Sequence, residues 1–284
     1  MKTEFYVLTT MSNMHVGSGE YNVGVIDNLV QRDVINKFPN INSSSLKGAF
    51  REFFKSEKND DFIKRVFGSA PKAQDDKASG SFRFFEANIL SYPVRSNVVA
   101  YLRAVSIDVL KEFLLKIKMF QKQNDYKELV NVLNFLTGID VKEKKPIVFN
   151  TKLDKAIVED FELKAEIYSK DLDNTMRTAL YKYFGKRVVL LHNNDFQRLC
   201  GENMLPVISR NYLESGESKN LWYEEVVPRL TQFYFPVMEE DRDADDFESK
   251  LSDSLIQFGG NASIGYGYSK IEPILLLNLK SYEN

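Results

Sequence analysis

The sequence SSSLKGAFREFFK, residues 43–55, contains the clearest helical pattern of the chain. Its apolar residues recur three and four positions apart, which is the spacing of one face of an α-helix. These apolar residues are Leu46, Ala49, Phe50, Phe53 and Phe54. Ser43 to Ser45 are the expected N-cap, because serine hydroxyls accept hydrogen bonds from the first free amides of a helix. The opposite face carries Lys47, Arg51 and Lys55, so we predict an amphipathic helix with a cationic outer face.

Strands are predicted on both sides of this helix. Residues 4–10, EFYVLTT, are rich in aromatic and β-branched types and form the opening strand. A glycine-rich loop then leads into a second predicted strand from Val23 to Val30. After the helix, residues 69–80 are polar and indicate a loop, and Phe82 to Leu90 form the next predicted strand.

The rest of the chain alternates between helical and strand patterns. Helices are predicted at residues 107–122, 125–137, 174–184 and 195–204, whereas residues 141–173 show no clear pattern. Residues 205–235 indicate a strand pair around the turn ESGES. A last helix is predicted from Asp245 and Asp246, through Phe247, Leu251 and Leu255, to Gly259 and Gly260, and a strand from Gly267 to Leu277 closes the chain.

This order of strand, helix, strands, helix and strand is typical of an α+β fold of the ferredoxin or RRM kind with large insertions. Because no linker composition or internal repeat interrupts it, we expect a single domain over residues 1–284.

Composition narrows the class of protein. The chain is 43% hydrophobic and has 21 Phe and 14 Tyr, which is typical of a packed globular protein and not of a disordered one. Its one cysteine, Cys200, excludes an intramolecular disulfide and a cysteine-based zinc site. No signal-peptide or membrane-spanning pattern is visible, so we expect a cytoplasmic protein without a membrane partner. Since the net charge is only −2, RNA binding would require positive charge gathered in one place.

The start of the 43–55 helix is one candidate for such a place. Lys47 lies in its first turn, where a cation opposes the helix dipole unless an anion binds there. A phosphate would resolve this conflict, with the serine hydroxyls, Lys47 and Arg51 as its partners. Gly48 would let a nucleic-acid backbone approach closely. An ordinary solvated helix face remains an equally open interpretation.

A glycine-rich segment, GGNASIGYGYSK at residues 259–270, is a second candidate. Such a loop can present its backbone amides to phosphates, with Tyr266 and Tyr268 available for stacking on bases. The competing interpretation is a helix C-cap followed by a turn.

Two residues near the N-terminus could carry chemistry. Asp27 interrupts the apolar run GVIDNLV, where an unpaired buried carboxylate would be costly, so it is exposed, paired or functional. In an RNA-cutting enzyme it could hold a divalent cation or orient the attacking 2′-hydroxyl. His15 precedes it, and either assists or serves as a hydrogen-bonding loop residue. Since His192 is the only other histidine, the sequence gives little support for a mechanism in which two histidines act as acid and base.

The segment LWYEEVVP, residues 221–228, could supply further acid or base groups through Tyr223, Glu224 and Glu225. Alternation along a strand would place the two glutamates on opposite faces, so one of them could face a ligand. The acidic run from Glu239 to Glu248 has the composition of a metal cluster but lacks EF-hand spacing, which favours a solvated loop and helix start.

Five blocks of the chain resemble one known family in their order and spacing. They are HVGSGEYNVGVIDNLVQRD, FPNINSSSLKGAFRE, FRFFEANILSYPVRS, LWYEEVVP and FGGNASIGYGYSKI, between residues 15 and 271. Together they resemble the RAMP superfamily, and within it the fourth subunits of Cmr complexes, which form the helical backbone of type III-B CRISPR effectors. The glycine block differs from the usual sequence of the family at Asn261, Ala262 and Ser263.

The resemblance implies an RRM-like palm with a protruding thumb, which we place within about 205–235, and stacking of subunits into a helical filament along a CRISPR guide RNA. It further implies partnership with other Cmr subunits and with a single-stranded target RNA, which is cut at regular intervals with a divalent metal, Mg²⁺ or Mn²⁺. The implied RNA-binding residues are Arg32, Ser44, Lys47, Arg51, Gly259, Gly260, Asn261, Gly265 and Gly267.

By the same resemblance Asp27 is the catalytic, metal-binding aspartate, and His15, Tyr223 and Glu224 support cleavage. Three alternatives stay open beside this prediction. The chain could be a non-catalytic scaffold of the same complex, the equivalent backbone subunit of a Csm (type III-A) complex, or a ribonuclease of the superfamily that processes precursor guide RNA alone.

Overall fold

The computed structural model describes residues 1–19, 24–69, 78–120, 124–159, 163–170, 172–215, 217–252, 254–277 and 279. The chain forms two compact units: Met1–Asn88 with Leu205–Pro273, and Ile89–Met204 with Ile274–Asn284. It passes from the first unit to the second within strand β4, Ala87–Val94. A single domain over residues 1–284 stays a prediction, because the presence of two compact units does not show whether they function separately.

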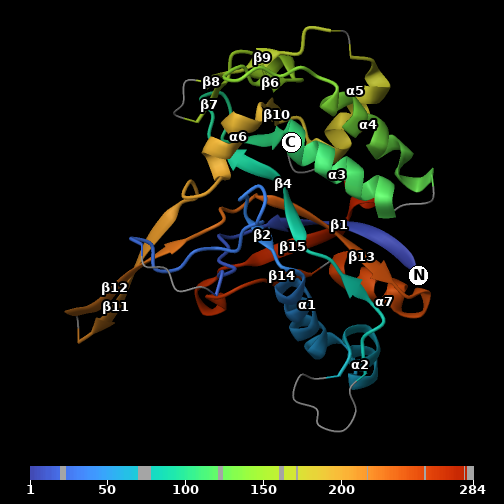
Figure 1. Ribbon diagram of the computed structural model, residues 1–284, viewed down its shortest axis with the longest axis vertical. Helices are drawn as coiled ribbons and strands as arrows, with labels where there is room; N and C mark the ends of the chain where they lie inside the picture. Colours follow the sequence, from blue (N-terminus) through green and yellow to red (C-terminus); the bar gives the residue numbers. More distant parts are fainter. Residues whose placement is uncertain are drawn as a thin grey trace. The chain divides into compact units, whose positions relative to one another are not determined.

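The first unit is built on an antiparallel sheet (Figure 1). Its strands run in the order β14 (Leu255–Gln257), β15 (Tyr268–Pro273), β1 (Lys2–Thr10), β13 (Gln232–Glu239) and β3 (Arg83–Phe84). Helix α1 (Ser43–Glu57) follows β1, and helix α7 (Asp241–Ser252) follows β13. Along the chain the order is therefore β1, α1, β3, β13, α7, β15. This succession, with β1 between β15 and β13, is that of a ferredoxin or RRM fold, so the predicted α+β class is confirmed.

Aromatic rings fill the core of this unit. Phe54 of α1 stacks on Phe247 of α7 with ring centroids 5.1 Å apart. On the sheet, Tyr6 of β1 stacks on Phe235 of β13 at 5.6 Å. Phe50 contacts both layers, at 5.7 Å from Phe247 and 5.8 Å from Phe235, and is completely buried. Truncating such a ring to alanine typically costs about 3 to 5 kcal/mol, so these rings fix α1 and α7 on the sheet.

Helix α1 confirms the predicted apolar face, with Leu46, Phe50 and Phe54 buried. The predicted serine N-cap is wrong, because Asn42 occupies that position and the serines already belong to the helix. Asn42 makes no side-chain cap, but its backbone N–H donates to the side chain of Gln31 at 2.8 Å. A partner from another segment thus sets where the helix begins.

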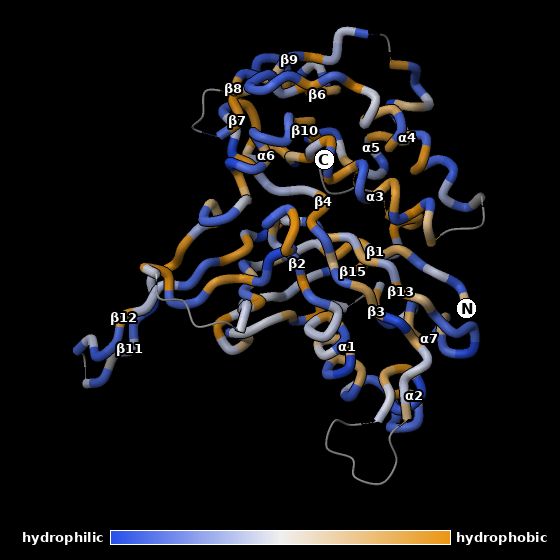
Figure 2. Tube along the Cα trace, viewed as in Figure 1, coloured by the Kyte–Doolittle hydropathy of each residue, from blue (hydrophilic) through white to orange (hydrophobic). Residues whose placement is uncertain are grey.

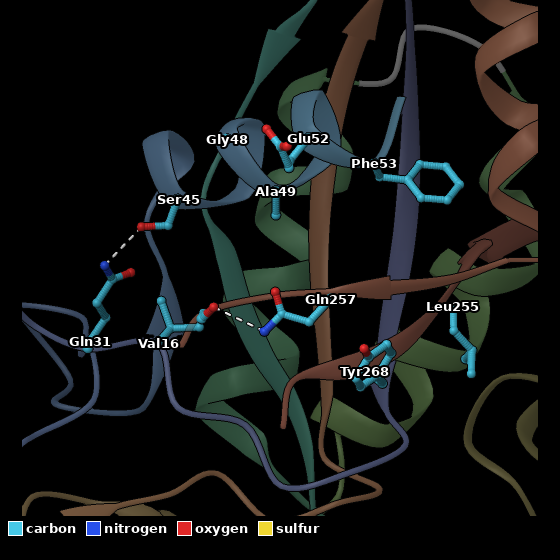
Figure 3. A pocket seen from close by; sticks show the side chains of 12 residues that line it. Val16, Gln31, Ser45, Gly48, Ala49, Glu52, Phe53, Leu255, Gln257 and Tyr268 are labelled. Atoms are coloured by element: carbon cyan, nitrogen blue, oxygen red, sulfur yellow. Dashed lines mark hydrogen bonds between the residues drawn. The ribbon is translucent and has the colours of Figure 1, made fainter. Parts of the chain in front are cut away.

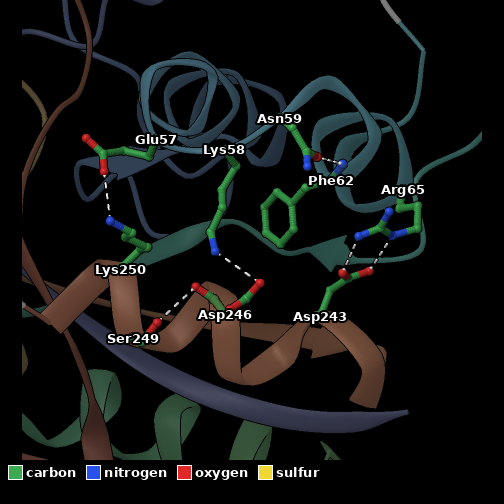
Figure 4. Close-up of polar contacts among 9 residues, drawn as sticks. All are labelled: Glu57, Lys58, Asn59, Phe62, Arg65, Asp243, Asp246, Ser249 and Lys250. Carbon is green, nitrogen blue, oxygen red and sulfur yellow. Dashed lines mark hydrogen bonds and ion pairs between the residues drawn. The ribbon is translucent and has the colours of Figure 1, made fainter.

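Ion pairs join the end of α1 and the short helix α2 (Asp60–Phe67) to α7 (Figure 4). Arg65 grips Asp243 through two hydrogen bonds of 2.8 and 3.1 Å, and this aspartate side chain is only 5% exposed. Lys58 pairs with Asp246, and Lys250 pairs with Glu57, each at 3.0 Å. Exposed pairs contribute little to stability, so the two-pronged Arg65 contact is the stronger of these links.

The predicted strand pair at 205–235 is a hairpin of β11 (Val207–Glu214) and β12 (Glu217–Glu225), whose register pairs Arg210 with Trp222. It extends away from the sheet of the first unit (Figure 1). Its far end is hydrophilic (Figure 2), and residues 217–221 are exposed. Only the end nearest the sheet, at Glu224 and Glu225, is buried. This is the arrangement expected of a thumb.

Two predictions near the C-terminal end of the first unit are wrong. The last helix runs over Asp241–Ser252 and ends well before the predicted Gly259 and Gly260. Leu255, predicted on its apolar face, lies in β14 opposite Lys270 and is 55% exposed. The helical spacing extends past the real end of the helix, but residues 255–257 pair with β15 instead. This contact between separate segments decides their conformation. The closing strand β15 also ends at Pro273, before the 3₁₀ helix η4 (Ile274–Leu276).

The predicted strand from Val23 to Val30 is wrong for the residues described, and Val23 lies outside them. Residues 24–30 form only isolated bridges, between Asn28 and Glu224 and between Val30 and Gly17. Val25 is 86% exposed, so the apolar pattern does not mark a buried strand. The predicted 82–90 strand is divided into β3 and β4. Of the predicted 69–80 loop, residues 70–77 lie outside the described part, and its ends meet where Ser69 N–H donates to Ala78 O at 2.9 Å.

The second unit has its own sheet, in the order β4, β5 (Leu102–Ser106), β10 (Val188–Leu191), β6 (Ile147–Val148) and β9 (Glu166–Ile167). Its helices are α3 (Ile107–Phe120), α4 (Lys127–Thr137), α5 (Asn174–Phe184) and α6 (Asn193–Cys200), close to the four predicted spans. The described residues of the unassigned 141–173 region form only short elements, among them the antiparallel pair of β7 (Ile157–Val158) and β8 (Leu163–Lys164). Among the described residues, no helix combines the length and the apolar character needed to cross a bilayer.

Candidate nucleic-acid interface

All the predicted site residues lie in the first unit, around the base of the β11–β12 hairpin and the outer face of α1. The segment around Asp27 runs along β12. Asp27 N–H donates to Tyr223 O at 3.1 Å, and Asp27 Oδ2 accepts the Tyr223 N–H at 2.7 Å. Asp27 is exposed, and no donor from the described part of the chain contacts its Oδ1. The carboxylate is therefore both paired and presented to solvent.

His15 lies beside the same strand. It is 8% exposed, and its Nδ1 lies 2.7 Å from the carbonyl oxygen of Glu225. Because a carbonyl only accepts, Nδ1 is the nitrogen that donates in this hydrogen bond. A Cβ on Gly17 would meet Nε2 at 3.2 Å, so this glycine leaves room beside the ring. The histidine is thus held in one orientation by the main chain of β12.

Glu224 accepts hydrogen bonds from four side chains of this region, and 5% of its surface is exposed. Its Oε1 accepts hydrogen bonds from Trp222 Nε1 at 3.1 Å and from Asn28 Nδ2 at 3.3 Å. Its Oε2 accepts from Arg210 Nη1 at 2.9 Å and from Asn261 Nδ2 at 3.0 Å. Burial raises the pKa of Glu224 most strongly, but the hydrogen bonds from Trp222 and Arg210 outweigh it and the pKa is lowered.

Four donors occupy the lone-pair positions that a carboxylate offers. These contacts suit Glu224 to positioning Asn28, the hairpin and the glycine loop more than to exchanging protons. Its role in cleavage, like that of His15 and Tyr223, stays a prediction. The side chain of Tyr223 is on the surface, with 38% exposed.

Glu225 and Arg32 form a second buried pair. Arg32 Nη2 donates to Glu225 Oε1, and Arg32 Nη1 donates to the Lys37 carbonyl at 2.7 Å. The side chains are 12% and 1% exposed for Arg32 and Glu225. Glu225 Oε2 also accepts the Val30 N–H at 3.2 Å. Arg32, predicted to bind RNA, therefore already ties the 30–37 loop to the hairpin. Glu224 and Glu225 are both buried and paired, so neither faces an open site.

The glycine loop joins β14 to β15, so its interpretation as a helix C-cap is wrong. Its glycines are required by close approach: a Cβ on Gly267 would lie 1.9 Å from Phe258 O, and a Cβ on Gly259 would lie 2.2 Å from His15 O. The expectation that the loop offers its amides to phosphate is contradicted for Gly260, Gly265 and Gly267. Their N–H groups donate within the protein, to His15 O, Ala262 O and Asn13 O. Contact of this loop with RNA through other atoms stays a prediction.

The outer face of α1 carries positive charge, as predicted. Burial lowers the pKa of Lys47 most, and the neighbouring cations Arg51 and Arg83 lower it further. Three cations therefore repel one another there, which is the situation that a bound anion relieves. Arg51 Nη1 donates to Ser69 O at 3.1 Å, whereas Ser44 is exposed and the space beside Gly48 is open. The sequence did not indicate Arg83, because it belongs to β3 and lies 26 residues beyond the end of the helix.

A pocket of about 530 Å³ connects α1 with the glycine loop (Figure 3). Gly48, Ala49 and Phe53 form its helical wall, and Gln257, Gly259 and Tyr268 lie across from them. At one end Gln31 donates to Ser45 Oγ at 3.0 Å. The two regions that the sequence indicated separately as RNA contacts thus border one hollow.

The described residues offer few ligands for the divalent metal that the family resemblance implies. Within the described ranges, no three His, Cys, Asp or Glu side chains are grouped so that they could hold a metal ion. The acidic run from Glu239 to Glu248 belongs instead to the end of β13 and to α7. Asp27 Oδ1 is the available ligand near the hairpin. One carboxylate fits a Mg²⁺ ion that keeps several waters and takes substrate phosphate oxygens, so Asp27 would hold the ion only together with bound RNA.

The chain is similar to known proteins in both sequence and fold. The chain is 28% identical to the CRISPR system Cmr endoribonuclease Cmr4 of Pyrococcus furiosus over 294 residues, covering 95% of each protein. It is 24% identical to the CMR subunit Cmr4 of Saccharolobus solfataricus over 255 residues, covering 81% of this chain and 82% of that protein. The fold is similar to a chain of the type III-B Cmr-beta complex in its apo state, with a TM-score of 0.80, 23% identity, and 96% and 97% of the two chains covered. The oligomeric Cmr4 of P. furiosus gives a TM-score of 0.68 at 23% identity, over 96% and 97% of the chains.

The family model of the RAMP superfamily matches residues 7–270, nearly the whole chain. That span includes both sheets, the hairpin, the cationic helix face and the glycine loop. This protein is a member of the RAMP superfamily.

Proposed function

We propose that this chain is a guide-binding backbone subunit of a type III-B (Cmr) CRISPR effector complex and that it cleaves the target RNA. The observation that carries the proposal is the exposed carboxylate of Asp27, held at one oxygen by Tyr223. The curated relative that is 28% identical over 95% of both proteins is a Cmr endoribonuclease, and such a carboxylate suits that activity.

Guide binding is assigned to the outer face of α1 and the pocket beside it. Lys47, Arg51 and Arg83 supply positive charge to a chain whose net charge is −2. Phosphate contacts position a nucleic acid without reading its sequence, which suits a subunit whose specificity comes from guide pairing. Stacking of such subunits side by side, as a helical filament with other Cmr subunits, would continue this surface along the guide.

Cleavage is assigned to Asp27 at the base of the hairpin. In this proposal the 2′-hydroxyl of the target attacks the adjacent phosphorus, a P–O2′ bond forms and the P–O5′ bond breaks. The 2′-hydroxyl proton passes to a solvent water and the 5′-oxygen takes a proton from solvent, so the products are a 2′,3′-cyclic phosphate and a 5′-hydroxyl. Asp27 orients the attacking hydroxyl, and His15, whose Nδ1 is held by the main chain of β12, supports cleavage. A divalent cation, when bound with the RNA, would add charge stabilisation at the phosphate.

The alternatives predict different outcomes. A non-catalytic scaffold would bind the same RNA without cutting it, and the Csm equivalent would carry guides of a type III-A system. The stand-alone processing ribonuclease is disfavoured, because His192 serves as the N-cap of α6 and accepts the Asn194 N–H at 3.2 Å. A paired-histidine site is therefore not available to it.

The test is to purify the chain from its own host and sequence the RNA that comes with it. Repeat–spacer guides are expected, and their absence would refute the backbone assignment. The purified complex is then given end-labelled complementary target with and without divalent metal. Cuts at regular intervals are expected, whereas intact target under all conditions would select the scaffold alternative.

A further inference from the structure

Arg210 lies at the base of the hairpin and has no role in the predictions above. It is in β11, directly opposite Trp222 of β12. Residues two apart on a strand share a face, so Arg210, Trp222 and Glu224 lie on the same side of the hairpin, as their mutual contacts require. The Arg210 side chain is 19% exposed, so it is partly open to solvent.

The guanidinium is held in place on three sides. Nη1 donates to Glu224 Oε2 at 2.9 Å. The rings of Trp222 and Tyr266 each lie 5.7 Å from the guanidinium carbon, within the range of cation–π attraction. A flexible arginine loses considerable rotamer entropy when it binds a ligand, and these contacts have already restricted this one. Arg210 is thus preorganised.

Its hydrogen-bonding capacity is only partly used. Arginine has five N–H donors, and within the described residues Arg210 makes one hydrogen bond, through Nη1. An arginine with a purely structural role commonly spends two parallel donors on its carboxylate, as Arg65 does on Asp243. Glu224 moreover divides its charge among four donors, so it does not cancel the positive charge of Arg210.

Arg210 is connected to Asp27 through consecutive residues of β12. The backbone of Tyr223 holds Asp27, and the next residue, Glu224, holds Arg210. Asn28, which follows Asp27, donates to the other oxygen of Glu224 at 3.3 Å. Asp27 therefore lies along one edge of β12, and β11 with Arg210 lies along the other, so two strand spacings of about 4.8 Å separate their backbones. The Arg210 side chain crosses part of this distance, because it reaches Glu224, which also accepts from Asn28.

We propose that Arg210 binds a non-bridging oxygen of the target phosphate that is cleaved beside Asp27. This rests on the proposed function and names the group that recognises the phosphate. As the P–O2′ bond forms and the P–O5′ bond breaks, negative charge grows on the non-bridging oxygens, and fixed N–H donors stabilise it. Arg210 transfers no proton, because arginine stays protonated. The proton movements remain those given above.

The first test measures single-turnover cleavage by the assembled complex. Arg210→Gln should slow cleavage by about 10²- to 10³-fold, the usual effect of removing one donor to a transition-state oxyanion. Arg210→Lys, which keeps the charge but not the planar fork, should recover part of the rate. Arg177→Gln, which removes the same charge from exposed helix α5, is the matched control and should cut at the normal rate.

A structural effect of the mutation is separated by modifying the RNA. Target carrying a single phosphorothioate of defined stereochemistry at one cleavage position should slow the wild type in one diastereomer. In Arg210→Gln the same substitution should cause little further slowing, because the contact is already lost. Equal slowing in both proteins, or a normal rate in Arg210→Gln, overturns the proposal while leaving Asp27-dependent cleavage intact.

Binding provides a measurement that does not depend on cleavage. In the Asp27→Asn complex, a neutral methylphosphonate at the same position should weaken target binding, and adding Arg210→Gln should abolish that penalty. If the wild type binds target without cutting, the enzymatic part of the proposed function fails, and this arm alone decides whether Arg210 holds the phosphate. A methylphosphonate penalty that is unchanged by Arg210→Gln refutes it, as does a complex that binds no RNA.

Discussion

Asp27 and Tyr223 are joined by two hydrogen bonds. The Asp27 N–H donates to the Tyr223 carbonyl oxygen, and the Tyr223 N–H donates to the Asp27 carboxylate. Replacing Asp27 by Asn keeps an oxygen that can accept the Tyr223 N–H. We therefore expect Asp27→Asn to assemble and to capture target normally, while cleavage falls by at least about 10²-fold. The measurement is a time course on end-labelled target with both complexes. Chelation of divalent metal should mimic the mutant in the wild type, and regular cuts at normal rate in Asp27→Asn would exclude Asp27 from the mechanism.

Removing charge from α1 should weaken RNA binding and its salt dependence together. Lys47→Gln and Arg51→Gln should each flatten the slope of log K against log salt by about 0.7, the value for one phosphate contact on a single strand. Arg83→Gln should act in the same direction, because Arg83 belongs to the same cation group. Lys111→Gln, which removes the same charge from an exposed position of helix α3 in the second unit, is the control. An unchanged slope in all three test variants would show that this face is not the phosphate site.

Glu224 should prove to be a stabilising residue. Glutamine presents one acceptor and one donor where four donors now converge, so Glu224→Gln should destabilise the protein by about 3 kcal/mol. Because its pKa is lowered in the folded state, Glu224 contributes stability above its unfolded pKa and loses it as the pH falls through the folded pKa. Thermal unfolding should thus show a smaller stability loss in acid for Glu224→Gln than for the wild type. A mutant of normal stability whose pH–rate profile alone changes would instead identify a proton-transfer role.

Glu239 should make stability depend on pH in the opposite sense. Burial, followed by the charges of Glu248 and Glu4, raises its pKa to about 8, although Tyr6 donates to it and Lys2 lies nearby. Its stabilising contribution is therefore full below the unfolded pKa, and it declines as the pH rises toward 8 by on the order of a few kcal/mol. Glu239→Gln should remove most of this decline in melting temperature between pH 5 and pH 8. A wild-type melting temperature that is flat over that range would contradict the assignment.

Two glycines of the 259–270 loop should differ sharply in tolerance. A Cβ on Gly267 would lie 1.9 Å from Phe258 O, whereas Gly265 has nothing within 4 Å, and both have positive φ. Gly265→Ala should therefore show only backbone strain, on the order of 1 kcal/mol. Gly267→Ala should cost several-fold more or prevent folding, as measured by chemical denaturation. Equal effects of the two substitutions would show that the loop can shift away from Phe258.

Local patterns predicted the elements in which buried apolar residues recur at a fixed spacing along the chain. Helix α1 was recognised because Leu46, Phe50 and Phe54 follow one face, and that face is the one buried. Helix α7 was placed too late for a related reason: Phe247 and Leu251 are buried in it, but the same spacing also includes Leu255, which pairs in a strand. Periodicity describes how a segment could fold, whereas pairing with a distant strand decides between the options.

The sequence was sufficient to identify the fold class and the family, because both rest on the order of the apolar patterns and of the five family-like blocks along the chain. It also singled out Asp27, since a carboxylate within an apolar run needs a reason. Tertiary structure alone decided what surrounds that carboxylate. Glu224 takes its donors from Asn28, 196 residues away, from Arg210 on the neighbouring strand, and from Asn261, 37 residues further on. Hydrogen bonds depend on distance and direction in space, so no spacing along the chain could reveal that Arg210 belongs to the site.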